Sequence, residues 1–448
     1  MSKFGRRLQQ GTTSSVVGSP QEPEEPQQPQ TGPSPAYWAQ WQNGPPTTDT
    51  WFPLSVWSGH IDSAHGGMVN GYADLGAGLR DAGINVLDGT WDWITTTGPS
   101  YVQRAIDLGF LLFASGPSAS YLQNNPTHRD YIIGWQTGDE FDMFRANDNA
   151  PYGTNSPTTT RNAYVANRNI DSTRPQHINY GKPTGGGWYT APGGYDTGSQ
   201  DGDLKLYQEA TDVSSVDYYW YTDPWEPRDD GAYSYGVSMD FQRHYSDMDD
   251  PAKPLWMFVE NSRPWDRASR AITPHEMEAA TWNSIVHGAR GIIYFIHDFG
   301  AGGTNGTGEF GVWSQNYYDR ATGDAIIAKM KVVNARIMSL APVLNSPQIG
   351  AINATTGRES AAAFMTVSST NGIPIDLMVR QYGGQTYVFA QASGDADHGA
   401  SGNTTGTFTW LGGGSGAATV RDESRTVNRT NGVWTDTFTA YQMHIYVF

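Results

Sequence analysis

The stretch Tyr131-Ile-Ile-Gly-Trp-Gln-Thr-Gly-Asp-Glu140 is an apolar run that ends in two acidic residues. A second run of the same kind, Pro254-Leu-Trp-Met-Phe-Val-Glu260, ends in a single glutamate. Short apolar runs with polar ends predict buried strands, so each glutamate is expected at the rim of a buried sheet. Because a carboxylate in such a place costs free energy, two of them indicate chemistry, such as an acid and a nucleophile.

Six more short apolar runs alternate with helix-like stretches. The eight predicted strands are 52–57, 84–87, 110–114, 132–136, 178–180, 216–221, 255–259 and 292–296. Thr273-Pro-His-Glu276 combines an N-cap, a proline at the first helical position and a glutamate at the third, which predicts a helix that ends near His287. Strand and helix alternating eight times predicts an α/β fold, a (β/α)₈ TIM barrel over residues 37–344. Its active site is expected at the carboxyl ends of the strands.

The segments on either side of the predicted barrel have different compositions. Residues 1–36 are rich in Pro and Gln, which predicts an extended or disordered arm that docks into a larger protein assembly or serves as a tether. Residues 345–448 are rich in Gly, Ser and Thr and contain alternating strand patterns, which predict an antiparallel β-sandwich. Its predicted strands are 361–367, 375–380, 385–391, 405–410, 418–421 and 440–448.

Composition narrows the classes of partner. The 448 residues carry a formal net charge of -17, so a nucleic-acid partner is not expected, because phosphate binding requires clustered Lys and Arg. No apolar stretch approaches the length of about 18 residues that membrane insertion requires. The chain has no cysteine and no recognisable signal peptide, so an extracellular or virion-associated protein would use another export route. The 16 Trp and 24 Tyr suit carbohydrate, although a large core would also use them.

Several polar and aromatic residues near the predicted strand ends are candidates for substrate binding. They are His60, Asp88, Trp91, Tyr219, Tyr221, Tyr294, His297 and Asp298. The three tyrosines are also candidate hydrogen-bond donors to Glu260, which would have to be ionised in order to act as a nucleophile. His60, Asp62 and His65 have a spacing that suggests a metal site, but no third cluster of ligands accompanies them. No metal or cofactor is therefore expected.

The layout of residues 52–344 resembles that of the clan A glycoside hydrolases, which are retaining enzymes built on a (β/α)₈ barrel. The run from Glu278 to Phe295 looks like the helix and eighth strand that follow the nucleophile in beta-galactosidase-like members. The resemblance implies that Glu140, after strand four, is the acid/base and that Glu260, after strand seven, is the nucleophile. Many members carry Asn before the acid/base. Asp139 stands there in this chain and would take over its contact with a sugar hydroxyl.

Two interpretations follow from the sequence. The first is a retaining glycoside hydrolase that cleaves a polysaccharide or cell-surface glycan by a two-glutamate double displacement, with Glu140 and Glu260 catalytic. The second is a non-catalytic carbohydrate-binding or structural component of a virion, such as a phage tail protein. For the two glutamates themselves, the alternative to catalysis is an ion pair with a neighbour such as Arg263 or Arg145.

Overall fold

Eight parallel strands close into a barrel in chain order, as the sequence predicts. The computed structural model describes residues 35–57, 61, 71–89, 98–143, 156–187, 196–223, 231–246, 253–264, 270–298, 308–346, 351–352, 359–360, 364–394 and 401–448. The strands are β1 (Leu54–Trp57), β2 (Val86–Asp88), β3 (Leu111–Ser115), β4 (Ile132–Asp139), β5 (Gln176–Tyr180), β6 (Val213–Val216), β7 (Leu255–Glu260) and β8 (Ile292–Phe295). Strand β8 pairs with β1 and closes the barrel.

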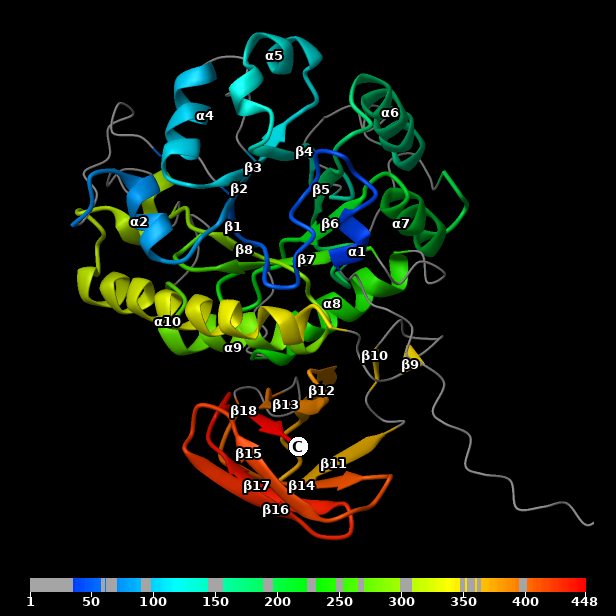
Figure 1. The fold of residues 1–448 in the computed structure, drawn as a ribbon, viewed down its shortest axis with the longest axis vertical. Coiled ribbons are helices and arrows are strands. Elements are labelled where there is room, and N and C mark those ends of the chain that lie inside the picture. Colours follow the sequence, from blue (N-terminus) through cyan, green and yellow to red (C-terminus); the bar gives the residue numbers. More distant parts are fainter. Residues whose placement is uncertain are drawn as a thin grey trace, which may run out of the picture.

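Helices surround the barrel (Figure 1). Those of the described residues are α1 (Pro35–Trp38), α2 (Leu75–Asp81), α4 (Gly98–Asp107), α5 (Ala119–Asn124), α6 (Pro157–Ile170), α7 (Gln200–Gln208), α8 (Tyr233–Tyr245), α9 (Pro274–Val286) and α10 (Arg320–Leu344), with short 3-10 turns η2 (Pro126–His128) and η4 (Gly308–Trp313). The predicted start of α9 is confirmed, because Thr273 and Glu276 form a reciprocal capping box. In the described part of the chain, no helix has the length and apolar character to cross a membrane.

The sixth strand differs from its prediction. The aromatic run from Tyr218 to Tyr221 has the composition of a strand, yet β6 ends before it, at Val216. The strand itself is Val213-Ser-Ser-Val216, and its two serines are fully buried. Intrinsic strand preference is therefore overridden here by the pairing of β6 with β5 and β7. As a result, Asp217 and Tyr219 lie directly beyond a strand end, where an active site is expected.

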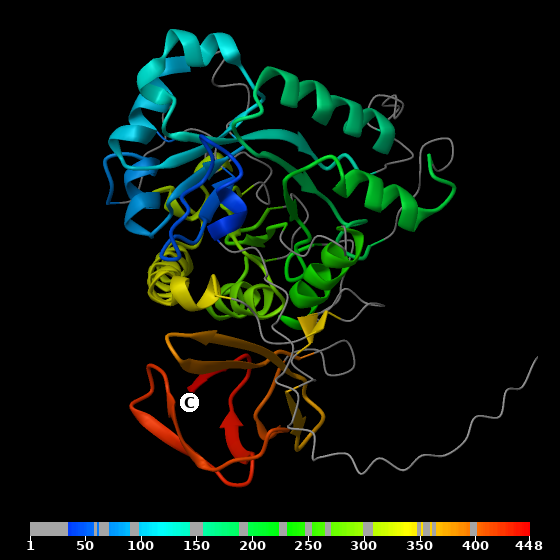
Figure 2. The ribbon, with the colours of Figure 1, turned by 45° about the vertical axis from the view of Figure 1, so that its right-hand side comes forward.

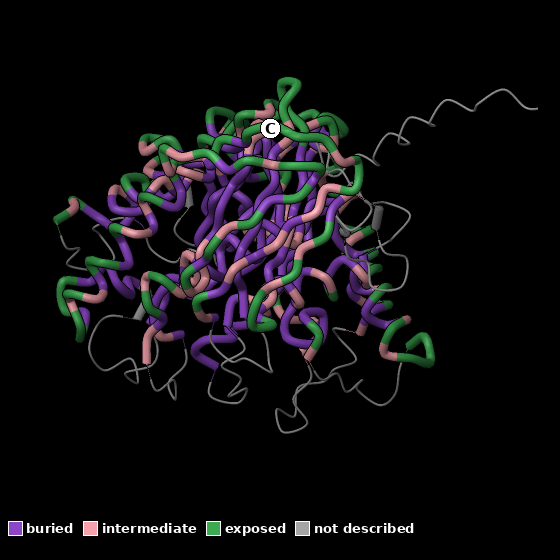
Figure 3. Tube along the Cα trace, turned by 90° about the horizontal axis from the view of Figure 1, so that it is seen from below, coloured by how far each residue is buried: buried purple, intermediate pink, exposed green. Residues whose placement is uncertain are grey.

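The barrel interior is packed with large apolar side chains, among them Phe113, Trp256 and Phe258. Figure 3 shows the buried residues gathered along the strands at the centre of the molecule. One group of inward-facing residues is polar and has at most 1% exposure: Asp88, His177, Asn179 and Ser215. Such side chains are costly in an interior unless they contact one another.

Helix α1 and the residues after it contact the amino-terminal side of the barrel. The Tyr37 hydroxyl donates to the backbone oxygen of Asp212, which precedes β6, at 2.8 Å. Asn43 donates from its side chain to Thr173, which precedes β5, at 2.9 Å. Trp38 and Trp41 are buried, so this first described segment belongs to the packed part of the chain. The arm predicted before it lies outside the described residues, apart from its last two.

The carboxyl-terminal part forms the predicted antiparallel sheets. One sheet has the order β11-β14-β17 and the other β12-β13-β18-β15-β16, and a short pair, β9 (Ala351–Ile352) and β10 (Glu359–Ser360), precedes them. Their bounds are β11 (Met365–Ser369), β12 (Ile375–Tyr382), β13 (Gln385–Ala392), β14 (Thr404–Trp410), β15 (Gly416–Val420), β16 (Arg425–Arg429), β17 (Val433–Phe438) and β18 (Met443–Val447). Phe408 and Trp434 stack between the sheets with their ring centroids 5.0 Å apart.

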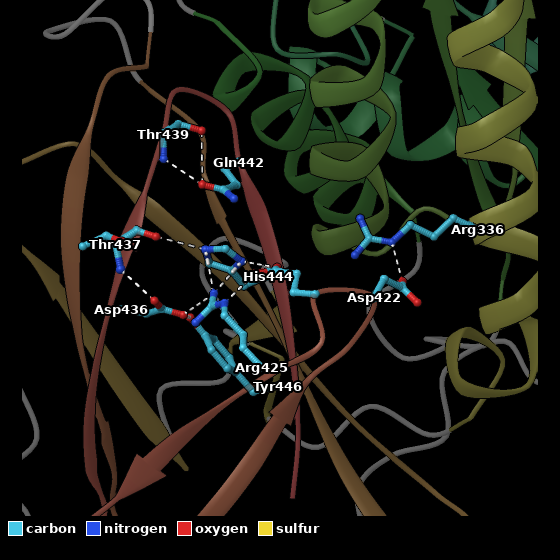
Figure 4. A network of polar contacts seen from close by, with 10 residues as sticks. Arg336, Asp422, Arg425, Asp436, Thr437, Thr439, Gln442, His444 and Tyr446 are labelled. Carbon is cyan, nitrogen blue, oxygen red and sulfur yellow. Dashed lines mark hydrogen bonds and ion pairs between the residues drawn. The ribbon is translucent and has the colours of Figure 1, made fainter.

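A polar network also supports this part (Figure 4). Arg425 donates to Asp436 at 2.8 Å, and the hydroxyl of Tyr446 donates to the same carboxylate at 3.0 Å. Arg336 on α10 pairs with Asp422 at 3.0 Å and so joins the sheets to the barrel. The contact is partly exposed, so its contribution to stability is small.

The five-stranded sheet packs against α9 and α10 (Figure 2). Apolar residues of this sheet, including Met378, Phe389 and Ile445, belong to the same buried cluster as the outer side of the barrel. Among them lies a charged group. His287, which caps α9, contacts Asp240 of α8 at 3.1 Å and Asp376 of β12 at 3.3 Å. Burial alone would lower the pKa of His287, but the two carboxylates outweigh it and raise the pKa to about 9.

We expect the stability contributed by this group to depend on pH. Because the folded-state pKa of His287 lies above its ordinary value of 6.5, the contribution is complete below about pH 6.5 and is lost as the pH rises through about 9. The loss corresponds to about 3 kcal/mol. The free energy of unfolding of wild type and His287→Gln should therefore differ most near pH 6 and converge near pH 10. His244→Gln, at a surface contact with Asp201, is the control. A difference that does not change with pH would contradict the assignment.

Candidate active site

Glu140 and Glu260 lie at the same end of the barrel. Glu140 directly follows β4, and Glu260 is the last residue of β7. Since all eight strands are parallel, their carboxyl ends form one rim, which is where TIM-barrel active sites are built. Glu140 has a φ of +49°, a conformation that costs a non-glycine residue about 1 kcal/mol or more. Strain of this kind is typical of residues whose side-chain direction serves a function.

The charges of the two glutamates both influence the pKa of one group, the phenol of Tyr219. Burial raises the pKa of Tyr219, and the negative charges of Asp217, Glu140, Glu260 and Asp139 raise it further. Charges influence a buried group in this way only from nearby positions. The ends of β4, β6 and β7 therefore bring carboxylates together around Tyr219.

Glu260 is fully buried and accepts three hydrogen bonds. The donors are the hydroxyl of Tyr235, the backbone N–H of Tyr221 at 3.2 Å and the hydroxyl of Thr222 at 3.4 Å. Burial raises the pKa of Glu260 to about 7, and these hydrogen bonds offset the effect only in part. The sequence-based expectation that neighbours keep this glutamate firmly ionised is thus met only above about pH 7.

The donors to Glu260 differ from the predicted tyrosines. Tyr221 contributes its backbone rather than its phenol, and the Tyr294 hydroxyl instead donates to Asn334 of α10 at 2.9 Å. Side chains alternate along a strand, and Tyr294 pairs in register with Val259 rather than with Glu260. Tyr294 therefore points out of the barrel, and its prediction as a donor to Glu260 was wrong. Tyr235 was missed because it lies in α8, away from every predicted strand end.

We expect Glu260→Gln to stabilise the fold at alkaline pH. The pKa of Glu260 rises from 4.5 to about 7 on folding, so its burial costs nothing below about pH 4.5 and costs most above about pH 7. The full cost corresponds to about 3 kcal/mol. A neutral amide of the same shape avoids it, so thermal unfolding should show a gain for the variant at pH 8 and little at pH 4.5. Glu278→Gln, at a partly exposed pair with Lys329, is the matched control. A lower stability of Glu260→Gln at pH 8 would contradict this account.

Asp217 is a third carboxyl at the rim, and it contacts Glu140. Burial raises the pKa of Asp217 well above its ordinary range, as do the charges of Glu140 and Asp139 and a hydrogen bond with Glu140. Burial and these neighbouring charges therefore favour the neutral form of Asp217. The sequence reading missed Asp217 because it placed this residue inside a predicted strand.

Asp139 lies beside this pair and keeps solvent contact. Its residue surface is exposed, yet desolvation by the surrounding protein raises its pKa, as expected of a carboxylate in a recess. The side-chain N–H of Asn179 donates to Asp139 at 3.0 Å and lowers that pKa in part. An exposed acceptor next to Glu140 suits the sugar-hydroxyl contact predicted for Asp139.

The remaining predicted residues lie in different places. Asp88 has no exposed surface, and one of its oxygens lies 2.8 Å from Nδ1 of His177. His297 and Asp298 are also buried, and Arg263 lies 3.7 Å from Asp298, at ion-pair distance. His60 and Trp91 fall outside the described residues, as does Arg145. Within the described ranges, no group of three or more His, Asp or Glu side chains is arranged to hold a metal ion.

Comparisons with known proteins support the fold. No protein-family model matches the chain, and no curated protein matches its sequence. A GH42 beta-galactosidase structure is similar over 93% of this chain and 99% of its own, with a TM-score of 0.55 at 8% identity. A GH30 endoxylanase from Clostridium papyrosolvens C71 has a TM-score of 0.41 at 15% identity, with 88% of this chain and 95% of that chain covered. A family 51 alpha-L-arabinofuranosidase from Bifidobacterium longum has 0.44 at 12%, with 94% and 97% covered. The likeness to the GH42 beta-galactosidase structure shows the fold alone, a TIM barrel followed by antiparallel sheets.

Proposed function

We propose that the protein is a retaining glycoside hydrolase that cleaves O-glycosidic bonds of a polysaccharide or cell-surface glycan. The observation that carries the proposal is that Glu140 follows β4 and Glu260 ends β7, at the same rim of a barrel of parallel strands. A retaining glycosidase requires two carboxyl groups in different environments, because one acts as a protonated acid and the other as an ionised nucleophile. The barrel fold is consistent with it but does not establish it, because barrels support many chemistries.

In the proposed reaction each glutamate has one role. Ionised Glu260 attacks the anomeric carbon and forms a glycosyl ester, while Glu140 gives a proton to the departing oxygen. Glu140 then takes a proton from water, whose oxygen attacks the anomeric carbon and releases Glu260 as a carboxylate.

The proposal is tested by a glycan screen with a stereochemical readout. Polysaccharides from cell walls and plants are incubated with the protein, and the release of reducing sugar is measured. For a glycan that is cleaved, proton NMR identifies the anomer that forms first. We expect retention of configuration, and inversion would contradict the role of Glu260 as a nucleophile.

The pH dependence of the same reaction gives an independent check. Because Glu260 must be ionised and burial raises its pKa to about 7, kcat/KM should fall about tenfold per pH unit below that value. A profile that stays flat from pH 7 down to pH 5 would show that Glu260 is not the group whose ionisation limits the reaction.

One observation favours the non-catalytic alternative, in which the barrel binds sugars without cleaving them. Glu260 has no exposed surface, whereas a nucleophile must reach the anomeric carbon. Binding of a glycan in calorimetry without any product from it would favour this alternative. The expected virion association, phage tail role and extracellular location stay predictions.

A further inference from the structure

The turn between β17 and β18, residues 439–442, reaches the side of the barrel where the candidate active site lies. Nε2 of His275, at the start of α9, is 2.9 Å from the backbone oxygen of Ala440. The ring centroids of Tyr441 and His275 are 5.5 Å apart, and a Cβ atom on Gly231, just before α8, would lie 3.0 Å from the Tyr441 hydroxyl. Because each helix of such a barrel begins after the carboxyl end of a strand, these contacts place the turn on the side of the rim.

The backbone of this turn has an uncommon conformation at Tyr441. Its φ is +58°, a value that glycine or asparagine usually supplies in a turn and that is costly for a bulky residue. The turn is otherwise well formed, because the side-chain oxygen of Gln442 accepts from the backbone N–H of Thr439 at 2.9 Å and from its hydroxyl at 3.1 Å (Figure 4). A tyrosine in this place therefore indicates a role for its side chain.

The ring of Tyr441 contacts Tyr221, which belongs to the surroundings of Glu260. The two rings meet edge to face, with centroids 6.4 Å apart. The Tyr221 ring also contacts the ring of Tyr235, at 5.6 Å. The backbone N–H of Tyr221 and the hydroxyl of Tyr235 both donate to Glu260. Tyr441 thus packs on the residue that supplies one donor and that itself packs on the other.

Tyr441 is the outermost of these three rings. It is partly exposed, whereas Tyr221 is buried and Tyr235 has no exposed surface. Loss of the Tyr441 ring would leave a gap beside Tyr221, and the surroundings of such a gap relax into it only in part. Tyr221 would then be free to move, and the direction of its N–H toward Glu260 would be less well fixed.

Attachment of the sheets to the barrel does not account for this contact. Asn283 of α9 donates to Asp376 of β12 at 2.9 Å and to Gln391 of β13 at 3.1 Å. These hydrogen bonds lie beside the buried apolar cluster that the five-stranded sheet shares with the barrel, and together they hold the sheet on α9. The turn extends beyond that interface, so an aromatic ring on Tyr221 is better explained by its effect on the site.

We propose that Tyr441 is a positioning residue for Glu260, and that the carboxyl-terminal sheets thereby complete the candidate active site. Tyr441 keeps Tyr221 against Tyr235, so that the N–H of one and the hydroxyl of the other stay directed at the two carboxylate oxygens. The catalytic consequence rests on the proposed function, because a nucleophile attacks efficiently only from a fixed position. Tyr441 itself is not expected to touch the reacting atoms.

Hydrogen exchange tests the positioning without a substrate. The full-length protein is compared at pH 7 with Tyr441→Asn, which removes the ring but suits the positive φ, and with Tyr441→Phe, which keeps the ring. Tyr382→Ala is the matched control, because Tyr382 ends β12 of the same sheet and donates to Asp49 instead. Mass spectrometry of the peptide that contains Tyr221 and Thr222 should show exchange about tenfold faster in Tyr441→Asn alone.

Peptides of α9 show whether this effect is local. They pack against the sheet and should keep their wild-type exchange rate in every variant. A wild-type rate at Tyr221 in Tyr441→Asn would overturn the proposal. Equal acceleration at Tyr221 and in α9 would overturn it as well, because it would show a general loosening of the sheets rather than a loss of local order.

Turnover gives a second readout for any glycan that is cleaved. The kcat of Tyr441→Asn should fall about 10- to 100-fold, with KM within about twofold of wild type. Activated aryl glycosides should lose as much as natural glycans, because both require attack by Glu260. Tyr441→Phe and Tyr382→Ala should retain the wild-type kcat. An unchanged kcat in Tyr441→Asn, or a loss confined to KM, would overturn the proposal.

The two readouts separate this inference from the proposed function. Faster exchange at Tyr221 in Tyr441→Asn, in a protein that cleaves no glycan, would refute the glycosidase function alone. Cleavage of a glycan by a Tyr441→Asn variant with wild-type exchange and wild-type kcat would refute the positioning role alone.

Discussion

Glu260→Gln should lower the turnover of a cleaved glycan by about 10⁴-fold or more, because an amide cannot form the glycosyl ester. The protein should remain folded, since the amide keeps the shape of the carboxyl group and can still accept from Tyr235 and Tyr221. Steady-state rates of reducing-sugar release from wild type and variant measure the effect. Far-ultraviolet circular dichroism confirms that the loss is not caused by unfolding.

A surface glutamate provides the control for this result. Glu278 lies on α9, is partly exposed and pairs with Lys329 at 2.7 Å. It is not at the end of a barrel strand. Glu278→Gln should retain the wild-type rate. If Glu260→Gln retained it as well, Glu260 would be a structural residue and the double-displacement mechanism would be excluded.

Glu140→Gln should produce a loss that depends on the leaving group. For a natural glycan, whose departing oxygen needs a proton, the expected loss is about 10²- to 10⁴-fold. For an aryl glycoside with an acidic phenol as leaving group, the first step should proceed at close to the wild-type rate, and the glycosyl-enzyme should accumulate. A burst of phenol followed by slow turnover would show this directly.

The control for Glu140 comes from the other end of the same strand. Asp130 is exposed and precedes β4, whereas Glu140 follows it. Asp130→Asn should leave both classes of substrate unaffected. An equal loss for natural glycans and activated glycosides in Glu140→Gln would indicate that Glu140 only shapes the site.

The barrel could be predicted from the sequence because its strands are short apolar runs and its best-marked helix carries an explicit start signal at Thr273. The carboxyl-terminal strands β16 and β17 were not predicted. β16, Arg425-Thr-Val-Asn-Arg429, is mostly polar and pairs as an edge strand with β15. Val427 is the one buried residue of this strand, and one buried position is too little to reveal an alternating strand pattern in the sequence.

The site could be predicted only in part, because strand ends are visible in the sequence but side-chain directions are not. Glu140 and Glu260 could be found because each ends an apolar run. Tyr294 pairs with Val259, one position before Glu260, so its side chain lies on the outer face of the barrel. His177 and Asn179 are two positions apart in β5, and their shared inward face was a usable signal. Ser215 carried none, because a serine in a short strand is common.

The contacts of α1 and the residues after it determine how the proposed active site would be oriented if the amino-terminal segment were attached to another body. Tyr37 and Asn43 fasten this region to residues that precede β5 and β6, while Glu140 and Glu260 follow β4 and β7. Any anchor reached through Pro35 would therefore hold the barrel by its base. The rim that carries Glu140 and Glu260 would then face away from that attachment and stay accessible to a large partner.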